Sequence, residues 1–156
     1  MAEQQSAWTR RTWLRDAALT FAVSATPLSL WATPEEVTRE LREIFGTEPI
    51  SEGRVQLSLP ALAENGNSVA LGVDVDSPMS ETDHVVSIHI FAEKNPLPRV
   101  AEFELGPLAG KAAIRTRIRL ADSQSVMAVA KMSDGSLYSG AASIEVTQAA
   151  CLDFLI

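Results

Sequence analysis

Apolar and polar residues alternate along most of the chain after Pro49, and this period of two is the feature that most limits its fold. In residues 68–76, for example, Val or Leu occupies every second position from 69 to 75. Turn-forming Gly, Pro, Asn and Asp separate the alternating segments. These predicted strands are residues 54–59, 68–76, 84–93, 99–105, 112–120, 125–132 and 137–147. About seven short strands predict an all-β, immunoglobulin-like antiparallel sandwich.

One amphipathic helix is predicted before the strands. Thr33 and Pro34 fit the N-cap and first helical positions, and Glu36 fits the capping box. Apolar residues then recur on one helical face, and Gly46 ends the pattern. We therefore expect residues 33–147 to form a single domain, the helix followed by the sandwich.

The first 32 residues have the features of an export signal. Arg10 and Arg11 are followed by an aromatic residue, a leucine and the uncharged segment 17–31, which is the order of a twin-arginine signal. That segment is too short and too weakly apolar for a membrane span. We expect removal of residues 1–32, periplasmic localisation, and no membrane insertion after cleavage. Two alternatives remain at this point, cleavage after Ala25 and a cytoplasmic chain with a chance arginine pair.

The charge of the chain excludes one class of partner. The formal net charge is −7, with 20 acidic and 13 basic residues. Nucleic-acid backbones are bound by faces rich in Lys and Arg. We therefore predict no nucleic-acid partner.

Cys151 is the only cysteine among the 156 residues, and it follows the last predicted strand. A lone cysteine in an oxidising compartment either bridges another molecule or serves as a reactive thiol. From Thr147 to Cys151 an extended chain spans roughly 13 Å, enough to enter a partner's pocket. We predict a C-terminal arm over residues 148–156, with Cys151 as its functional group. An incidental cysteine is the alternative.

Several segments resemble the SoxY family, the sulfur-carrier subunits of the bacterial Sox thiosulfate-oxidising system. The similar segments are residues 63–67, 76–79, 87–96, 111–120 and 132–136, together with the twin-arginine leader. The resemblance implies a non-catalytic immunoglobulin-like domain in a heterodimer with a SoxZ-like subunit. It also implies that Cys151 holds thiosulfate-derived sulfur covalently, with periplasmic sulfur-oxidising enzymes and c-type cytochromes as clients.

The predicted arm departs from the SoxY pattern, which is Gly-Gly-Cys-Gly-Gly. Here Ala149 and Ala150 precede the cysteine, and Leu152 and Asp153 follow it. Alanine and leucine allow fewer backbone conformations than glycine, and their side chains add bulk. The ending is similar to SoxY-related paralogues with an Ala-Ala-Cys-(Ile/Leu)-acid arm, so we interpret these four residues as arm positions that client enzymes contact.

Other candidate sites are weaker. His84 and His89 would face opposite sides of a regular strand and could not chelate one ion, so no metal is predicted and no cofactor beyond sulfur on Cys151. An acidic cluster is interpreted as a solvated loop, with calcium as the less favoured alternative: Asp74, Asp76, Glu81 and Asp83. A ladder of arginines is interpreted as a solvated or edge-protecting face, with an anionic contact surface as the alternative: Arg115, Arg117 and Arg119.

The residues leave two alternatives to the carrier. One is a non-carrier interaction module that docks through its sandwich face and the apolar tail Phe154-Leu155-Ile156. The other, a thiol oxidoreductase, would need a resolving cysteine or an activating base near Cys151, and neither is evident.

Overall fold

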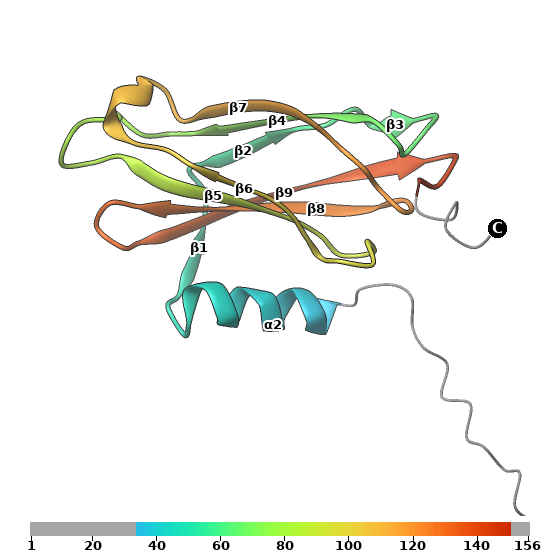
Figure 1. Cartoon of the computed structure of the whole chain (residues 1–156), viewed down its shortest axis with the longest axis horizontal. Helices are drawn as coiled ribbons and strands as arrows, with labels where there is room; N and C mark the ends of the chain where they lie inside the picture. The colour runs from blue at the N-terminus through green and yellow to red at the C-terminus, as the bar shows by residue number, and fades with distance from the viewer. Residues whose placement is uncertain (1–33, 151–156) are drawn as a thin grey trace, which may run out of the picture.

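The computed structural model describes residues 34–150, which form two packed β-sheets and one helix (Figure 1). In chain order the elements are α2 (Pro34–Phe45), β1 (Ile50–Glu52), β2 (Val55–Ser58), β3 (Leu62–Ala63), β4 (Val69–Val75), β5 (Val85–Ala92), β6 (Arg99–Glu104), the 3-10 helix η1 (Pro107–Ala109), β7 (Ala113–Ile118), β8 (Gln124–Met132) and β9 (Leu137–Val146). The predicted all-β sandwich with an N-terminal helix is confirmed.

The larger sheet has the order β1-β9-β8-β5-β6, and β3 also pairs with β9. The smaller sheet has the order β2-β4-β7 and is antiparallel throughout. Each of the seven predicted segments overlaps a strand, but the prediction missed β1 and β3. These two pair with β9 in parallel, so the described sandwich is not purely antiparallel. Segments of three and two residues are too short to show a period of two, and their pairing depends on β9.

The main core lies between the two sheets, where the inward side chains of facing strands meet. Its members from β4, β5, β7 and β8 include Leu71, Val73, Ile88, Ile90, Ile114, Val126 and Ala128. Most of these side chains have almost no exposed surface. Full burial of one large aliphatic side chain contributes about 1.5 to 3 kcal/mol, so this layer supplies much of the folding free energy.

Helix α2 covers the outer face of the larger sheet (Figure 1). Its buried Val37 packs in a second apolar cluster with Phe91 of β5, Val129 of β8 and Leu137 of β9. Strands β5 and β8 are therefore covered on both faces, and seven of the eight β5 residues are buried. This double burial explains why β5 has apolar residues at consecutive positions and not only at every second one.

His89 of β5 lies in this helix-covered layer and is 4% exposed. Its Nε2 is 3.0 Å from the Ser87 hydroxyl, and its ring meets the Phe45 ring edge-on with 4.9 Å between centroids. Nδ1 has no hydrogen-bond partner and lies 3.8 Å from a Glu102 carboxylate oxygen. Burial lowers the pKa of His89 below 6.5, and Arg99 and Lys131 lower it further, while Glu102 opposes them.

The lowered pKa of His89 predicts that acidification weakens the fold. Below about pH 6.5 the unfolded chain takes up the His89 proton before the folded chain does, so the free energy of unfolding falls as pH decreases. His89→Gln removes this titrating group. The free energy of unfolding, measured by urea unfolding, should therefore fall less between about pH 7.5 and about pH 5.5 in the variant than in the wild type. An unchanged pH dependence in the variant would contradict the assignment, since the two proteins differ only at residue 89.

Candidate functional site

The chain leaves β9 at one end of the sandwich, and backbone hydrogen bonds hold it there as far as Ala150. The Thr147 amide donates to the Ala63 carbonyl at 3.0 Å, and the Gln148 carbonyl accepts from the Gly66 amide at 2.8 Å. The Ala150 amide donates to the Leu120 carbonyl at 3.2 Å. Three hydrogen bonds thus hold the chain end against the sandwich.

The predicted arm residues divide at this point. Ala149 is half-buried, and Ala150 is buried with 5% of its surface exposed. Cys151, Leu152 and Asp153 lie outside the described residues, as do Arg10 and Arg11 of the predicted signal. The first three residues of the predicted arm over 148–156 contact the domain. The position next to Cys151 is therefore fixed by the sandwich.

Gly66 makes this attachment possible. The turn around it inserts between residues 120 and 150, and the Gly66 carbonyl accepts from the Leu120 amide at 2.9 Å. A Cβ at this position would overlap the Leu120 carbonyl oxygen and approach Val146 Cγ1 to 3.1 Å and the Ala150 nitrogen to 3.2 Å. Only glycine fits without a backbone shift. The sequence identified residues 64–67 as a turn and as part of the family resemblance, but not this contact.

Two buried amide side chains fix the loop that carries Leu120. Asn95 donates through Nδ2 to the Arg119 carbonyl at 2.9 Å, and its Oδ1 accepts from the Ala121 amide at 2.9 Å. Gln124 donates through Nε2 to Asn95 Oδ1 at 3.1 Å and accepts from the Lys94 amide at 2.8 Å. Buried polar groups that satisfy one another in this way define one local geometry. The loop thus presents the Leu120 carbonyl to Ala150 in a fixed position.

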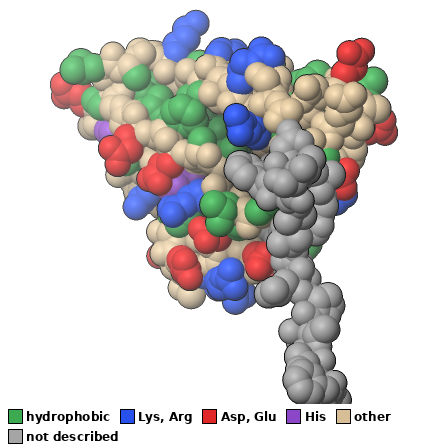
Figure 2. Space-filling view, turned by 45° about the vertical axis from the view of Figure 1, so that its right-hand side comes forward, with side chains coloured by type: hydrophobic (Ala, Val, Ile, Leu, Met, Phe, Trp, Pro, Cys, Tyr) green, Lys and Arg blue, Asp and Glu red, His purple; other side chains and the backbone are tan. Residues whose placement is uncertain are grey.

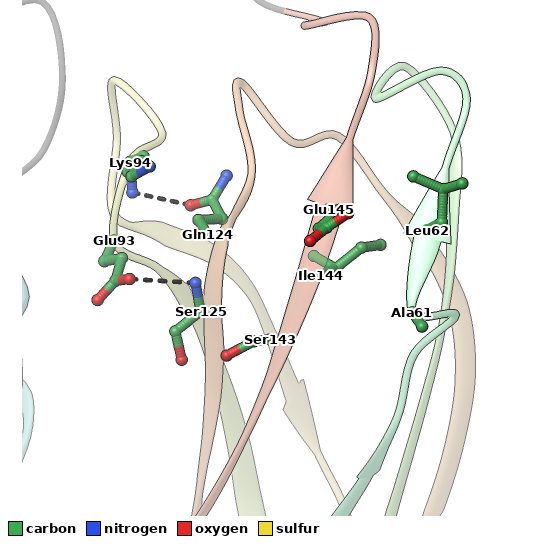
Figure 3. Close-up of a pocket in the computed structure, with 9 residues that line it drawn as sticks. All are labelled: Ala61, Leu62, Glu93, Lys94, Gln124, Ser125, Ser143, Ile144 and Glu145. Carbon is green, nitrogen blue, oxygen red and sulfur yellow. Dashed lines mark hydrogen bonds between the residues drawn. The ribbon is translucent and has the colours of Figure 1, made fainter.

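A hollow of about 610 Å³ lies beside the end of β9 (Figure 3). Its lining residues are Ala61, Leu62, Glu93, Lys94, Gln124, Ser125, Ser143, Ile144 and Glu145. Leu62 is 56% exposed, and the Lys94 ammonium lies 3.4 Å from an Asp122 carboxylate oxygen. Figure 3 shows the Glu93 carboxylate accepting from the Ser125 amide, a bond of 3.1 Å. The hollow therefore combines an apolar side with charges of both signs.

The other predicted features are dispersed. His84 Nδ1 contacts the Ser80 carbonyl at 3.0 Å, and His89 lies under α2. Between residues 34 and 150 no group of three or more His, Cys, Asp or Glu side chains is placed to hold a metal ion. No helix in that part of the chain has the length and apolar character to cross a membrane.

The predicted acidic cluster and the arginine ladder take part in surface contacts. Asp74 pairs with Arg115 at 2.8 Å, and Asp83 lies 3.9 Å from Arg54. Arg117 donates to the Ser68 hydroxyl at 2.6 Å. Exposed pairs of this kind contribute little to stability. Two of the three ladder arginines are thus engaged within the smaller sheet.

A two-sheet sandwich whose last strand leads directly to a single cysteine defines the class of protein, a β-sandwich domain with its candidate reactive group at a chain end. The family model described as "Sulfur oxidation protein SoxY" matches residues 41–151. The chain belongs to the SoxY family.

The solved structure of a SoxY protein agrees with this assignment, and other solved structures share the fold. The sulfur carrier protein SoxY from Chlorobium limicola f thiosulfatophilum aligns with a TM-score of 0.62 and 29% identity, covering 72% of this chain and 97% of that one. A superoxide reductase (neelaredoxin) from Ignicoccus hospitalis aligns with a TM-score of 0.52 and 16% identity, covering 75% and 95%. A putative superoxide reductase from Thermotoga maritima aligns with a TM-score of 0.52 and 18% identity, covering 63% of this chain and 87% of that one. The reductases share the fold alone. Comparison with curated proteins gave no match.

Replacing Gly66 by alanine should release the chain end. The added Cβ cannot coexist with the Leu120 carbonyl, so we expect Gly66→Ala to lower the free energy of unfolding by about 1 to 3 kcal/mol. Amide hydrogen exchange at Ala150 should accelerate at the same time. Gly106→Ala is the matched control, because Gly106 has an extended backbone and nothing within 4 Å of an added Cβ. Equal effects of the two substitutions would contradict this role of Gly66.

Proposed function

We propose that this chain is a periplasmic, non-catalytic sulfur carrier that binds sulfur covalently through Cys151. The observation that carries the proposal is the SoxY family match, which extends to residue 151 and so includes the only cysteine. The similar Chlorobium protein is itself described as a sulfur carrier. A thiol can hold sulfur in a disulfide-type bond and pass it to another sulfur nucleophile.

The loading step requires partners. Joining the Cys151 sulfur to the outer sulfur of thiosulfate forms an S–S bond, releases the thiol proton and removes two electrons. This chain has no second cysteine to accept those electrons, so we assign them to a c-type cytochrome of a client enzyme. A SoxZ-like subunit completes the carrier as a heterodimer.

The attachment of Ala150 determines how a client can approach Cys151. Ala150, which directly precedes the cysteine, is hydrogen-bonded to Leu120 of the sandwich. A client enzyme must therefore accommodate this end of the sandwich, including the hollow lined by Leu62 and Lys94, or first break the Ala150 bond. Ala149, Ala150, Leu152 and Asp153 are the chain-end positions such a client would contact.

Substitution of the cysteine tests the carrier function. Wild-type protein isolated during growth on reduced sulfur compounds should carry a mass adduct that reductant removes, whereas Cys151→Ser should carry none. The variant should still copurify with the SoxZ-like subunit, because the substitution changes none of the residues in the two apolar clusters. Intact-mass analysis measures both proteins, and an adduct that persists in the variant, or an unmodified thiol in the wild type, would favour the interaction module.

Substitution of the arginine pair tests export. Replacing Arg10 and Arg11 together by lysine should abolish periplasmic accumulation, because the twin-arginine route requires the pair. Cell fractionation and immunoblotting measure the effect, with Arg15→Lys as the matched control outside the pair. Undiminished export of the double variant would contradict the proposed route.

A further inference from the structure

The unpaired edges of the two sheets border a second hollow. Strand β6 pairs only with β5, and β7 only with β4, within the described strands. Between them lies a groove of about 420 Å³, whose apolar lining includes Leu97, Val100, Ala101 and Ile118. Leu97 is 77% exposed, which is unusual for a large apolar side chain beside free strand edges. We call this hollow the edge groove.

Basic side chains line the edge groove. Arg99 lies 3.8 Å from Glu40 and 3.9 Å from Glu102, and Arg117 is bonded to Ser68. The Arg119 guanidinium lines the groove and has no hydrogen-bond or ion-pair partner among residues 34–150. Figure 2 shows hydrophobic side chains on the visible face with Lys and Arg side chains above them. The groove therefore suits a segment that is mostly apolar and carries a negative charge.

The chain end and this groove lie on opposite sides of the 119–121 segment. The Leu120 carbonyl accepts from Ala150 on one side, and Asn95 of the groove lining bonds the Arg119 carbonyl and the Ala121 amide on the other. Six extended residues beyond Ala150 span roughly 20 Å, about the length of the six-residue strand β7. Figure 1 shows the end of β9 and the segment that follows β7 on the same side of the molecule. Residues 151–156 are long enough to pass Leu120 and enter the groove at Arg119.

We propose that residues 152–156, which we call the tail, dock in the edge groove of their own chain. In an extended segment Leu152, Phe154 and Ile156 share one face, and they would cover the apolar lining. Asp153 lies on the other face and would pair with Arg119 at the rim. Free strand edges are known to accept an added extended segment in this way.

Charge distinguishes this groove from the hollow in Figure 3. The rim of that hollow carries the carboxylates of Glu93 and Glu145, and its Lys94 already pairs with Asp122 (Figure 3). Asp153 would face two like charges there, whereas the edge groove offers an unpaired guanidinium. The edge groove is the favoured site for an acidic, apolar tail.

Docking would restrain Cys151 from both sides, through the Ala150 bond before it and the tail after it. The thiol would then be less accessible until a partner displaces the tail. The regulatory meaning of this restraint rests on the proposed carrier function. The docking of the tail is independent of the carrier function, because its test measures the reactivity of the unmodified Cys151 thiol.

Alkylation kinetics of the mature protein test the proposal. Deletion of residues 154–156, or Leu97→Ser, should raise the rate of Cys151 alkylation by iodoacetamide about fivefold or more, after correction for the thiolate fraction. Leu108→Ser is the matched control, because Leu108 is fully exposed on η1 and outside the groove. Rates equal to wild type in both the deletion and Leu97→Ser would overturn the proposal.

A charge exchange tests the predicted ion pair. Arg119→Glu and Asp153→Lys should each accelerate alkylation, and the double variant should return toward the wild-type rate. Arg42→Glu, on the exposed side of α2, is the matched control for charge reversal. Additive acceleration in the double variant would overturn the Arg119–Asp153 contact.

Amide NMR shifts locate the docking site. Comparison of the mature protein with its 154–156 deletion should show changes centred on residues 97–101 and 116–119. Changes centred on Ala61, Leu62 and Ser143 would place the tail in the other hollow and overturn the proposal. Changes that depend on protein concentration would assign the tail to a second copy, which also overturns it.

Discussion

The close approach of the Gly66 turn to the Leu120 carbonyl is the constraint on which the position of residues 147–150 depends. One backbone segment can enter the space between the 119–121 loop and the end of β9 only because residue 66 has no side chain. Its amide and carbonyl then bind both neighbours, and the Leu120 carbonyl remains free to accept from Ala150. A contact between three segments distant in sequence thus determines where the chain end begins.

The sandwich itself was predictable because its information is local. Alternation in strands such as β4 and β7 follows directly from one face being buried. The double burial of β5 was not evident, because it depends on α2 packing across the sheet. Strands β1 and β3 are paired through β9 and have too few residues to carry a pattern of their own.

The candidate site was predictable only in part, for the same physical reason. The sequence alone shows the single cysteine at position 151 and the two alanines before it. That Ala150 is buried depends on tertiary hydrogen bonds to Leu120, which no spacing within residues 148–156 reveals. The three ladder arginines look equivalent in sequence, yet Arg115 and Arg117 are engaged while Arg119 faces the edge groove.

The position of β9 in the larger sheet has a mechanical consequence. This ten-residue strand is bonded to β8 along its length and to β1 and β3 near its two ends. A force applied through the chain end acts along the strand axis. The hydrogen bonds between β9 and its neighbouring strands run across that axis, so the force would act on all of them at once as shear. The bonds of Gln148 and Ala150 would yield first and singly, so the chain end could be extended while the sandwich that anchors it stays intact.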